Sequence, residues 1–176
     1  MARQHKQTSS EAGKTTVPVM PLFERTAGYL DANDWHYTAH EDKTYFSAQC
    51  RIKDASVRVI LDVDESEEWQ RVLVYSCFPV YVPELRRSAV AEAIARINYG
   101  LAFGNLEVDL ADGEVRVRTV IESDGAISDP MIERTLTSNL GTADRFFSPI
   151  LAVAFGNTVP EKVIELAGEP GKTTVQ

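Results

Sequence analysis

The sequence predicts an α+β fold in which helices pack against an antiparallel β-sheet. Val90, Ile94 and Ile97 recur at helical spacing, whereas apolar and polar residues alternate with a period of two after Gly104. The strand-like segments are also joined by short connections, which favour antiparallel neighbours. Residues 83–121 therefore form a helix followed by a β-hairpin, and we expect the rest of the chain to cover this unit.

The composition is that of one globular domain. The chain has 176 residues, of which 44% are hydrophobic, which is enough for a single core and too little for two comfortable domains. Polar residues dominate both ends of the sequence. We therefore expect a disordered tail over residues 1–17, a single domain over residues 18–168 and a flexible tail over residues 169–176.

The charge of the chain bears on its partners. The formal net charge is −8, which argues against a surface that binds nucleic acid directly and favours basic or apolar protein partners. No apolar run approaches the roughly 20 residues that a membrane helix needs, and the N-terminus has no hydrophobic signal core. We therefore expect a cytoplasmic protein that does not associate with a membrane.

The first half of the chain predicts one helix and then strands. Pro21 precedes apolar residues at helical spacing, which predicts a helix that ends near Asp31, and the segment from Trp35 to Ala39 looks extended. Alternating segments then predict three strands, connected by short turns. These strands occupy residues 45–52, 57–64 and 69–78.

The third of these strands is apolar on both sides. Leu73 and Tyr75 alternate with Val72 and Val74, so both faces of the strand are apolar and should be buried against other elements. We expect the helix at residues 84–101 to supply one cover and the C-terminal region to supply the other.

The hairpin after this helix has a clear turn signal. Asp112-Gly113 predicts a tight turn between a strand that reaches Leu110 and a return strand that ends at Ile121. Asn98 lies beside the apolar stripe of the helix. It either caps the helix end through local backbone bonds or orders a contact with another element.

The C-terminal region predicts a broken helix. Asp129 is a good N-cap, but Pro149 predicts a kink or a break near Ser148. The sequence from Thr158 to Glu161 has the spacing of a capping box and opens a short last helix, which Gly168 can close.

No group of residues indicates a reaction. His36 and His40 lie in an extended segment and lack a third metal ligand, and Cys50 and Cys77 lack the spacing of a zinc site. The acidic run at residues 62–65 lacks the glycine and the distal glutamate of a calcium-binding loop. We therefore expect no enzymatic activity, no metal and no cofactor.

The order of elements and several motifs resemble the YbjN-like family of small bacterial proteins, described as sensory transduction regulators. The resemblance covers roughly residues 20–167, and it implies a fold like that of the type III secretion chaperones, usually homodimeric, in a binding protein without known enzymatic activity. The motifs are Tyr29-Leu30 with Trp35, then AVAEAIARINYGLAFGNLEVDLADGEVRVR, then DPMIERTLTSNLGTADRFFSPILAVAFG followed by Pro160-Glu161.

These features lead to the hypothesis of a non-enzymatic, protein-binding adaptor or chaperone-like regulator that acts as a homodimer. One alternative is a stress or signalling regulator that senses a small ligand between sheet and helices. Another is an acidic partner of a nucleic-acid-handling protein. The candidate contacts with a second copy or a partner are apolar, although the same residues could equally form the core of one domain. They are Phe146, Phe147, Ile150, Leu151, Phe155, Leu73 and Tyr75.

Overall fold

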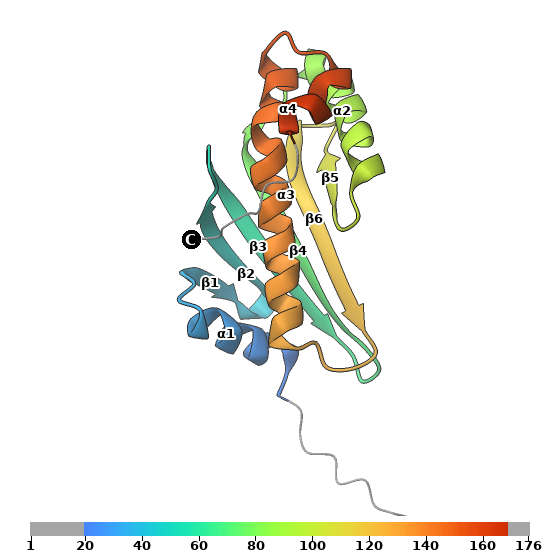
Figure 1. Ribbon diagram of the computed structural model, residues 1–176. Helices are drawn as coiled ribbons and strands as arrows, with labels where there is room; N and C mark the ends of the chain where they lie inside the picture. The colour runs from blue at the N-terminus through green and yellow to red at the C-terminus, as the bar shows by residue number, and fades with distance from the viewer. Residues whose placement is uncertain (1–19, 169–176) are drawn as a thin grey trace, which may run out of the picture.

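The computed structural model describes residues 20–168, so both predicted tails lie outside the described part of the chain. Six strands form one antiparallel sheet in the order β1-β2-β3-β4-β6-β5, and helices pack on it (Figure 1). The predicted α+β class is therefore confirmed. The strands are β1 (Tyr37–His40), β2 (Tyr45–Arg51), β3 (Ser56–Glu65), β4 (Gln70–Tyr81), β5 (Asn105–Val108) and β6 (Glu114–Ser123).

The longest helix, α3, crosses the sheet over β4 and β6, as Figure 1 shows. Helix α1 packs near β3, α2 packs beside β5, and the short helix α4 contacts both α2 and α3. Three short 3-10 helices complete the described chain. The helical elements are α1 (Leu22–Ala32), η1 (Glu41–Lys43), η2 (Glu84–Arg86), α2 (Arg87–Gly100), α3 (Asp129–Phe155), η3 (Pro160–Lys162) and α4 (Val163–Ala167).

The alternation of side chains assigns the two faces of the sheet. Phe46, Leu61, Val74 and Thr119 are aligned across β2, β3, β4 and β6, and all four are buried. This is the face under the helices, because the ring of Phe23 in α1 stacks on Phe46 with centroids 4.3 Å apart. The intervening positions of the strands point to the opposite face.

The prediction that helices cover both faces of β4 is wrong. The buried residues of α2, among them Val90 and Ile97, join the same core cluster as those of α3. Helix α2 therefore lies on the side of the sheet that α3 covers. On the opposite face, Leu73 is 8% exposed and Cys77 is 6% exposed. Neighbouring side chains on the sheet shield these two residues, so they need no second layer of helices.

A buried polar contact fixes α3 on the sheet. Asn139 is fully buried, and its side-chain amide donates to the carbonyl oxygens of Val74 at 3.0 Å and Val117 at 3.2 Å. The same amide donates to the hydroxyl of Thr119 at 3.2 Å, while its oxygen accepts a hydrogen bond from Ser76. One helix side chain thus links β4 to β6.

Helix α3 continues for 27 residues through Pro149, so of the predicted kink or break near Ser148 the break is wrong. A proline inside a helix removes one backbone hydrogen bond and costs about 3 kcal/mol. Burial of Phe146 and Ile150 on either side of the proline offsets this cost. The Ser148 hydroxyl also donates to the carboxylate of Asp54 at 2.6 Å, which anchors the helix to the turn between β2 and β3.

Two predicted helix starts differ in detail. The N-cap of α3 is Ser128 rather than Asp129, which becomes the first helical residue. The predicted capping box is not formed, because Val159 is the N-cap of η3 and no side chain bonds to the cap. Gly168 ends α4 as predicted, with a φ of 62° that favours glycine.

The β5–β6 hairpin forms, but its turn is longer than predicted. Residues 109–113 connect the strands, and Leu110, predicted to belong to the first strand, is 60% exposed. Gly113 has a φ of 89°, and its N–H donates to the Asp109 carbonyl at 2.8 Å. The guanidinium of Arg87 donates to backbone carbonyls of this turn, which joins it to the start of α2.

Asn98 closes the outer edge of β5. Its amide nitrogen donates to the Leu106 carbonyl at 3.0 Å, and its oxygen accepts from the Leu106 N–H at 2.9 Å. Of the two predicted roles, the contact with another element is therefore the one observed. The side chain takes the place that a neighbouring strand would occupy.

We expect Asn139→Ala to lower the free energy of unfolding by about 2–4 kcal/mol, because it leaves the Ser76 hydroxyl and two strand carbonyls without their buried partner. Chemical denaturation monitored by circular dichroism measures the change. The matched control is Asn157→Ala at an exposed position, for which the change should stay within about 0.5 kcal/mol. Equal stability of the two variants would show that the buried network does not hold α3.

Candidate functional site

The apolar residues predicted to contact a partner differ in how exposed they are in the structure. Phe146, Phe147 and Ile150 are buried under the sheet, so for these three the alternative of a core position applies. They offer no surface to a partner. Leu151 is half-buried, and Phe155, near the C-terminal end of α3, is 56% exposed.

Leu73 and Tyr75 lie together on the face of the sheet over which no helix of the described chain packs. We call this surface the open face. Its centre is apolar, with Leu73 and Tyr75 beside Ile60, and charged side chains surround that centre. The strand residues that form it are Thr38, His40, Tyr45, Ser47, Gln49, Arg51, Ser56, Arg58, Ile60, Asp62, Asp64, Arg71, Leu73, Tyr75, Cys77, Asn105, Glu107, Glu114, Arg116, Arg118, Val120 and Glu122.

A shallow hollow of about 220 Å³ lies at the centre of the open face. Strands β2, β3, β4 and β6 all contribute to it, so residues far apart in the sequence meet here. The hollow combines tyrosine rings and apolar side chains with groups of both charges. Its lining is Tyr45, Arg58, Ile60, Asp62, Tyr75, Cys77, Glu114 and Arg116.

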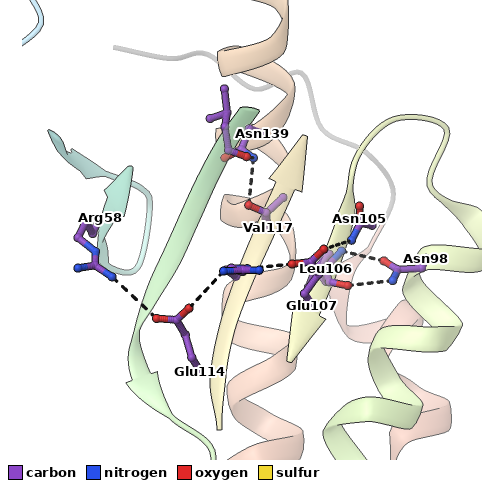
Figure 2. A network of polar contacts seen from close by, with 10 residues as sticks. Arg58, Asn98, Asn105, Leu106, Glu107, Glu114, Val117 and Asn139 are labelled. Carbon is purple, nitrogen blue, oxygen red and sulfur yellow. Dashed lines mark hydrogen bonds and ion pairs between the residues drawn. The ribbon is translucent and has the colours of Figure 1, made fainter. Parts of the chain in front are cut away.

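A chain of polar contacts crosses the open face from β3 to β5, as Figure 2 shows. Arg58 lies 3.8 Å from Glu114, and Glu114 lies 3.9 Å from Arg116. Arg116 forms the closest pair, with the Glu107 carboxylate at 2.8 Å, and Asn105 donates to the other oxygen of Glu107 at 3.1 Å. The contacts hold the two glutamates in place and leave Arg58 loosely paired.

One arginine side chain also approaches Tyr75. The guanidinium carbon of Arg116 lies 4.5 Å from the centroid of the Tyr75 ring, within the range of a cation–π contact. Arg118 is the direct cross-strand partner of Tyr75 and has no ion pair within the described chain.

The side chains of Cys50 and Cys77 pack within the fold and are not reactive thiols. Burial raises the pKa of Cys50 to about 11. Burial also raises the pKa of Cys77, and the charge of Glu114 adds to that effect. Both thiols therefore stay protonated near neutral pH and are poor nucleophiles.

His36 and His40 make different contacts. His40 stacks on Tyr45 and shares a hydrogen bond of 3.0 Å with Ser47, whereas His36 lines a separate groove at the edge of the sheet. Among the residues that the structure describes, no group of three or more potential ligands could hold a metal ion.

A second exposed surface lies between α2 and α4. Tyr99 is 97% exposed there, at the rim of a groove of about 540 Å³. Arg96 pairs with Glu92 at 2.7 Å and with Glu161 at 3.6 Å along the same rim. We call this surface, lined by Glu92, Ala95, Arg96, Tyr99 and Ile164, the α2–α4 groove.

The sequence analysis did not predict this groove, because it considered α2 only as a cover for the sheet. A signal was present, since Tyr99 falls outside the buried stripe formed by Val90, Ile94 and Ile97. Together with Ile164 of α4, which is 42% exposed, Tyr99 forms an exposed apolar patch, and such patches mark contact surfaces.

The family model described as "Putative bacterial sensory transduction regulator" matches residues 23–152, which is most of the chain. The chain belongs to the YbjN family. The predicted family resemblance is therefore confirmed. Among curated proteins, no sequence matches this YbjN-family chain.

Two solved structures are similar to this chain. "Crystal structure of YbjN, a putative transcription regulator from E. coli" is similar with a TM-score of 0.53 and 10% identity, covering 69% of this chain and 85% of that one. The HopA1–SchA chaperone–effector complex is also similar, with a TM-score of 0.44 and 19% identity, covering 70% of this chain and 91% of that one. At such identities the comparison with YbjN concerns the fold alone.

None of the helices in the described part of this YbjN-family chain combines the length and the apolar character that crossing a bilayer requires.

Burial raises the pKa of Asp62 in the hollow and outweighs the opposite effect of Arg71. A carboxyl whose folded pKa is raised destabilises the fold when it is ionised. We therefore expect Asp62→Asn to stabilise the protein at pH 7, and the gain to fade as the pH falls and the carboxyl becomes protonated in both states. Thermal unfolding between pH 7 and pH 3 measures this, with Asp124→Asn at an exposed position as the control. A gain that persists at low pH would contradict the explanation.

Proposed function

We propose that this chain is a cytoplasmic, non-enzymatic adaptor or chaperone-like regulator. In this proposal the open face binds a protein partner, and the α2–α4 groove joins two copies into a homodimer. The observation that carries the proposal is the open face itself. An antiparallel sheet with one solvated face normally shows polar residues there, whereas this face has Ile60 and Tyr75, both partly exposed, at its centre.

The side chains of the open face support binding rather than catalysis. Glu107 pairs with Arg116 at 2.8 Å, and Glu114 lies 3.8 Å from Arg58 and 3.9 Å from Arg116, so both acids belong to an ion-pair network. The thiol of Cys77 is protonated, because burial raises its pKa. An apolar centre with a charged rim is instead the usual anatomy of a protein interface.

The shape of the α2–α4 groove supports the homodimer. A two-fold interface brings the same patch of both copies together, so each patch needs a projection and a matching recess. Tyr99 is the projection, and the groove beside Ala95 and Ile164 is the recess. Glu92 and Arg96 supply opposite charges on the same rim, which can also pair between copies.

We expect Tyr99→Glu to convert the homodimer into a monomer, because a buried carboxylate without a partner would face the recess of the other copy. Light scattering across micromolar concentrations should give twice the chain mass for the unchanged protein and the single mass for the variant. Tyr81→Glu, at another exposed tyrosine outside the groove, is the matched control and should remain dimeric. A single-chain mass for the unchanged protein would contradict the homodimer.

We expect Tyr75→Asp to abolish capture of the protein partner, since it places a charge at the apolar centre of the open face. Affinity capture followed by mass spectrometry compares the proteins that each variant retains. Val159→Asp, which adds the same charge at an exposed apolar residue between α3 and η3, should retain the partner. If Tyr75→Asp captures the same proteins, the partner does not bind at the open face.

A further inference from the structure

Strand β2 is longer than the edge strand that lies beside it. Strand β1 pairs with β2 from Tyr45 to Ala48, so residues 49–51 of β2 have no strand on their outer side within the described chain. On the inner side, the same residues pair with β3 as far as Ser56. The sheet therefore has a short unpaired edge beyond the start of β1.

The backbone at this unpaired edge can accept another strand. The N–H of Ile52 donates to the Ala55 carbonyl at 2.9 Å, which lies on the β3 side. Successive residues of an antiparallel strand bond to alternate sides, so Arg51 directs its N–H and its carbonyl outward. No backbone hydrogen bond to either group is formed within the described chain. Unpaired groups of this kind are a template for an extended chain.

There is room for an extended chain beside this edge. An open groove of about 800 Å³ lies where β1 begins, between Gln49 of β2 and the segment that precedes β1. Trp35 and Tyr37 line the groove, and both side chains are half-buried, so their rings offer apolar contacts. We call this hollow the edge groove.

The described chain stops close to the unpaired edge. Arg145 of α3 donates to the carbonyl oxygen of Gly168 at 2.9 Å. The preceding residue, Asp144, accepts a hydrogen bond of 2.6 Å from the N–H of Lys53, in the turn that follows β2. One turn of α3 therefore contacts both Gly168 and the end of β2. A fully extended segment of residues 169–175 spans about 25 Å, which is enough to reach the outer side of β2.

The sequence after Gly168 is that of a turn followed by a strand. Pro170-Gly171 is a turn signal, and the β-branched residues Thr173, Thr174 and Val175 favour a strand. A turn is needed here, because the chain must change direction after Gly168 to run back along β2. A segment that passes Arg51 and then Gln49 runs antiparallel to β2, in the direction of β1, and leads toward the edge groove.

We propose that residues 172–175 pair as a short strand with residues 49–51 on the outer edge of β2. The added strand continues the line of β1 and closes the unpaired edge to strands of other molecules. Arg58 lines both the edge groove and the hollow of the open face, so the docked segment covers one border of the open face. The pairing does not depend on which partner the open face binds.

Hydrogen exchange measured by NMR tests this pairing at a single amide. The N–H of Arg51 is compared between the full chain and a variant that lacks residues 169–176. We expect this N–H to exchange about tenfold more slowly in the full chain, because the docked strand satisfies it. The N–H of Val59, in the centre of β3, is the reference within each sample. The ratio of the two rates is the readout, so a change in overall stability does not mimic the effect.

Proline variants of the full chain remove the backbone donors of the segment. Thr173→Pro combined with Thr174→Pro should raise the exchange rate of Arg51 to that of the shortened variant. The matched control exists in the same chain, because Gly-Lys-Thr-Thr-Val occurs at residues 13–17 as well as at residues 171–175. Thr15→Pro combined with Thr16→Pro should leave the exchange rate unchanged.

The reach of the chain makes this control informative. Residue 17 lies three residues before Met20, and the N–H of Leu22 donates to the Glu65 carboxylate. Glu65 and Ser56 are the two ends of β3, which lie about 30 Å apart at the rise of a strand. Three residues cannot bridge that distance to Arg51, which pairs with Ser56.

Three results would overturn the inference. The first is equal exchange of the Arg51 N–H in the full chain and in the variant without residues 169–176. The second is an equal effect of the two pairs of proline substitutions. The third is protection of Arg51 that grows with protein concentration, since that would identify a second copy of the chain as the occupant of the edge.

Discussion

The hydrogen bonds of Asn139 hold together the two layers of this protein. The side chain comes from the middle of α3 and reaches carbonyls of β4 and β6, so it allows only one placement of the helix along and across the sheet. A fully buried amide is costly when its partners are missing, and any slip of the helix would remove them. Hydrophobic packing alone would tolerate several placements. The amide selects one of them.

Much of the fold follows from local periodicity. The strands, the four helices and the hairpin are visible in the sequence because each alternates or repeats along its own length. The side on which α2 would pack was not visible, because it depends on how distant elements connect. The apolar pattern around Leu73 suggested a second layer of helices, yet partial shielding by neighbouring side chains is enough. Pro149 suggested a break, yet its neighbours are held by contacts far away in the sequence.

The candidate site shows the same contrast between features that local sequence patterns reveal and features that depend on distant contacts. Leu73 and Tyr75 could be selected from alternation alone, and both lie on the open face. Phe147 could not be separated from Phe155, because a dense run of apolar residues does not reveal which side of a helix is covered. The contact between Arg58 and Glu114 joins two strands that are not neighbours in the sequence, so it depends on the strand order and register of the sheet. No pattern within either strand indicates it.

The closure of β5 by Asn98 limits how copies of this chain can assemble. A sheet with two free edges can add molecules head to tail without end, which is the route to fibres. Here the backbone of Leu106 is already bonded to the Asn98 side chain, so the edge formed by β5 cannot accept a strand at that point. In the part of the chain that the structure describes, this leaves the edge formed by β1 for strand addition. Joining two such edges consumes both of them, so assembly through the sheet stops at a pair.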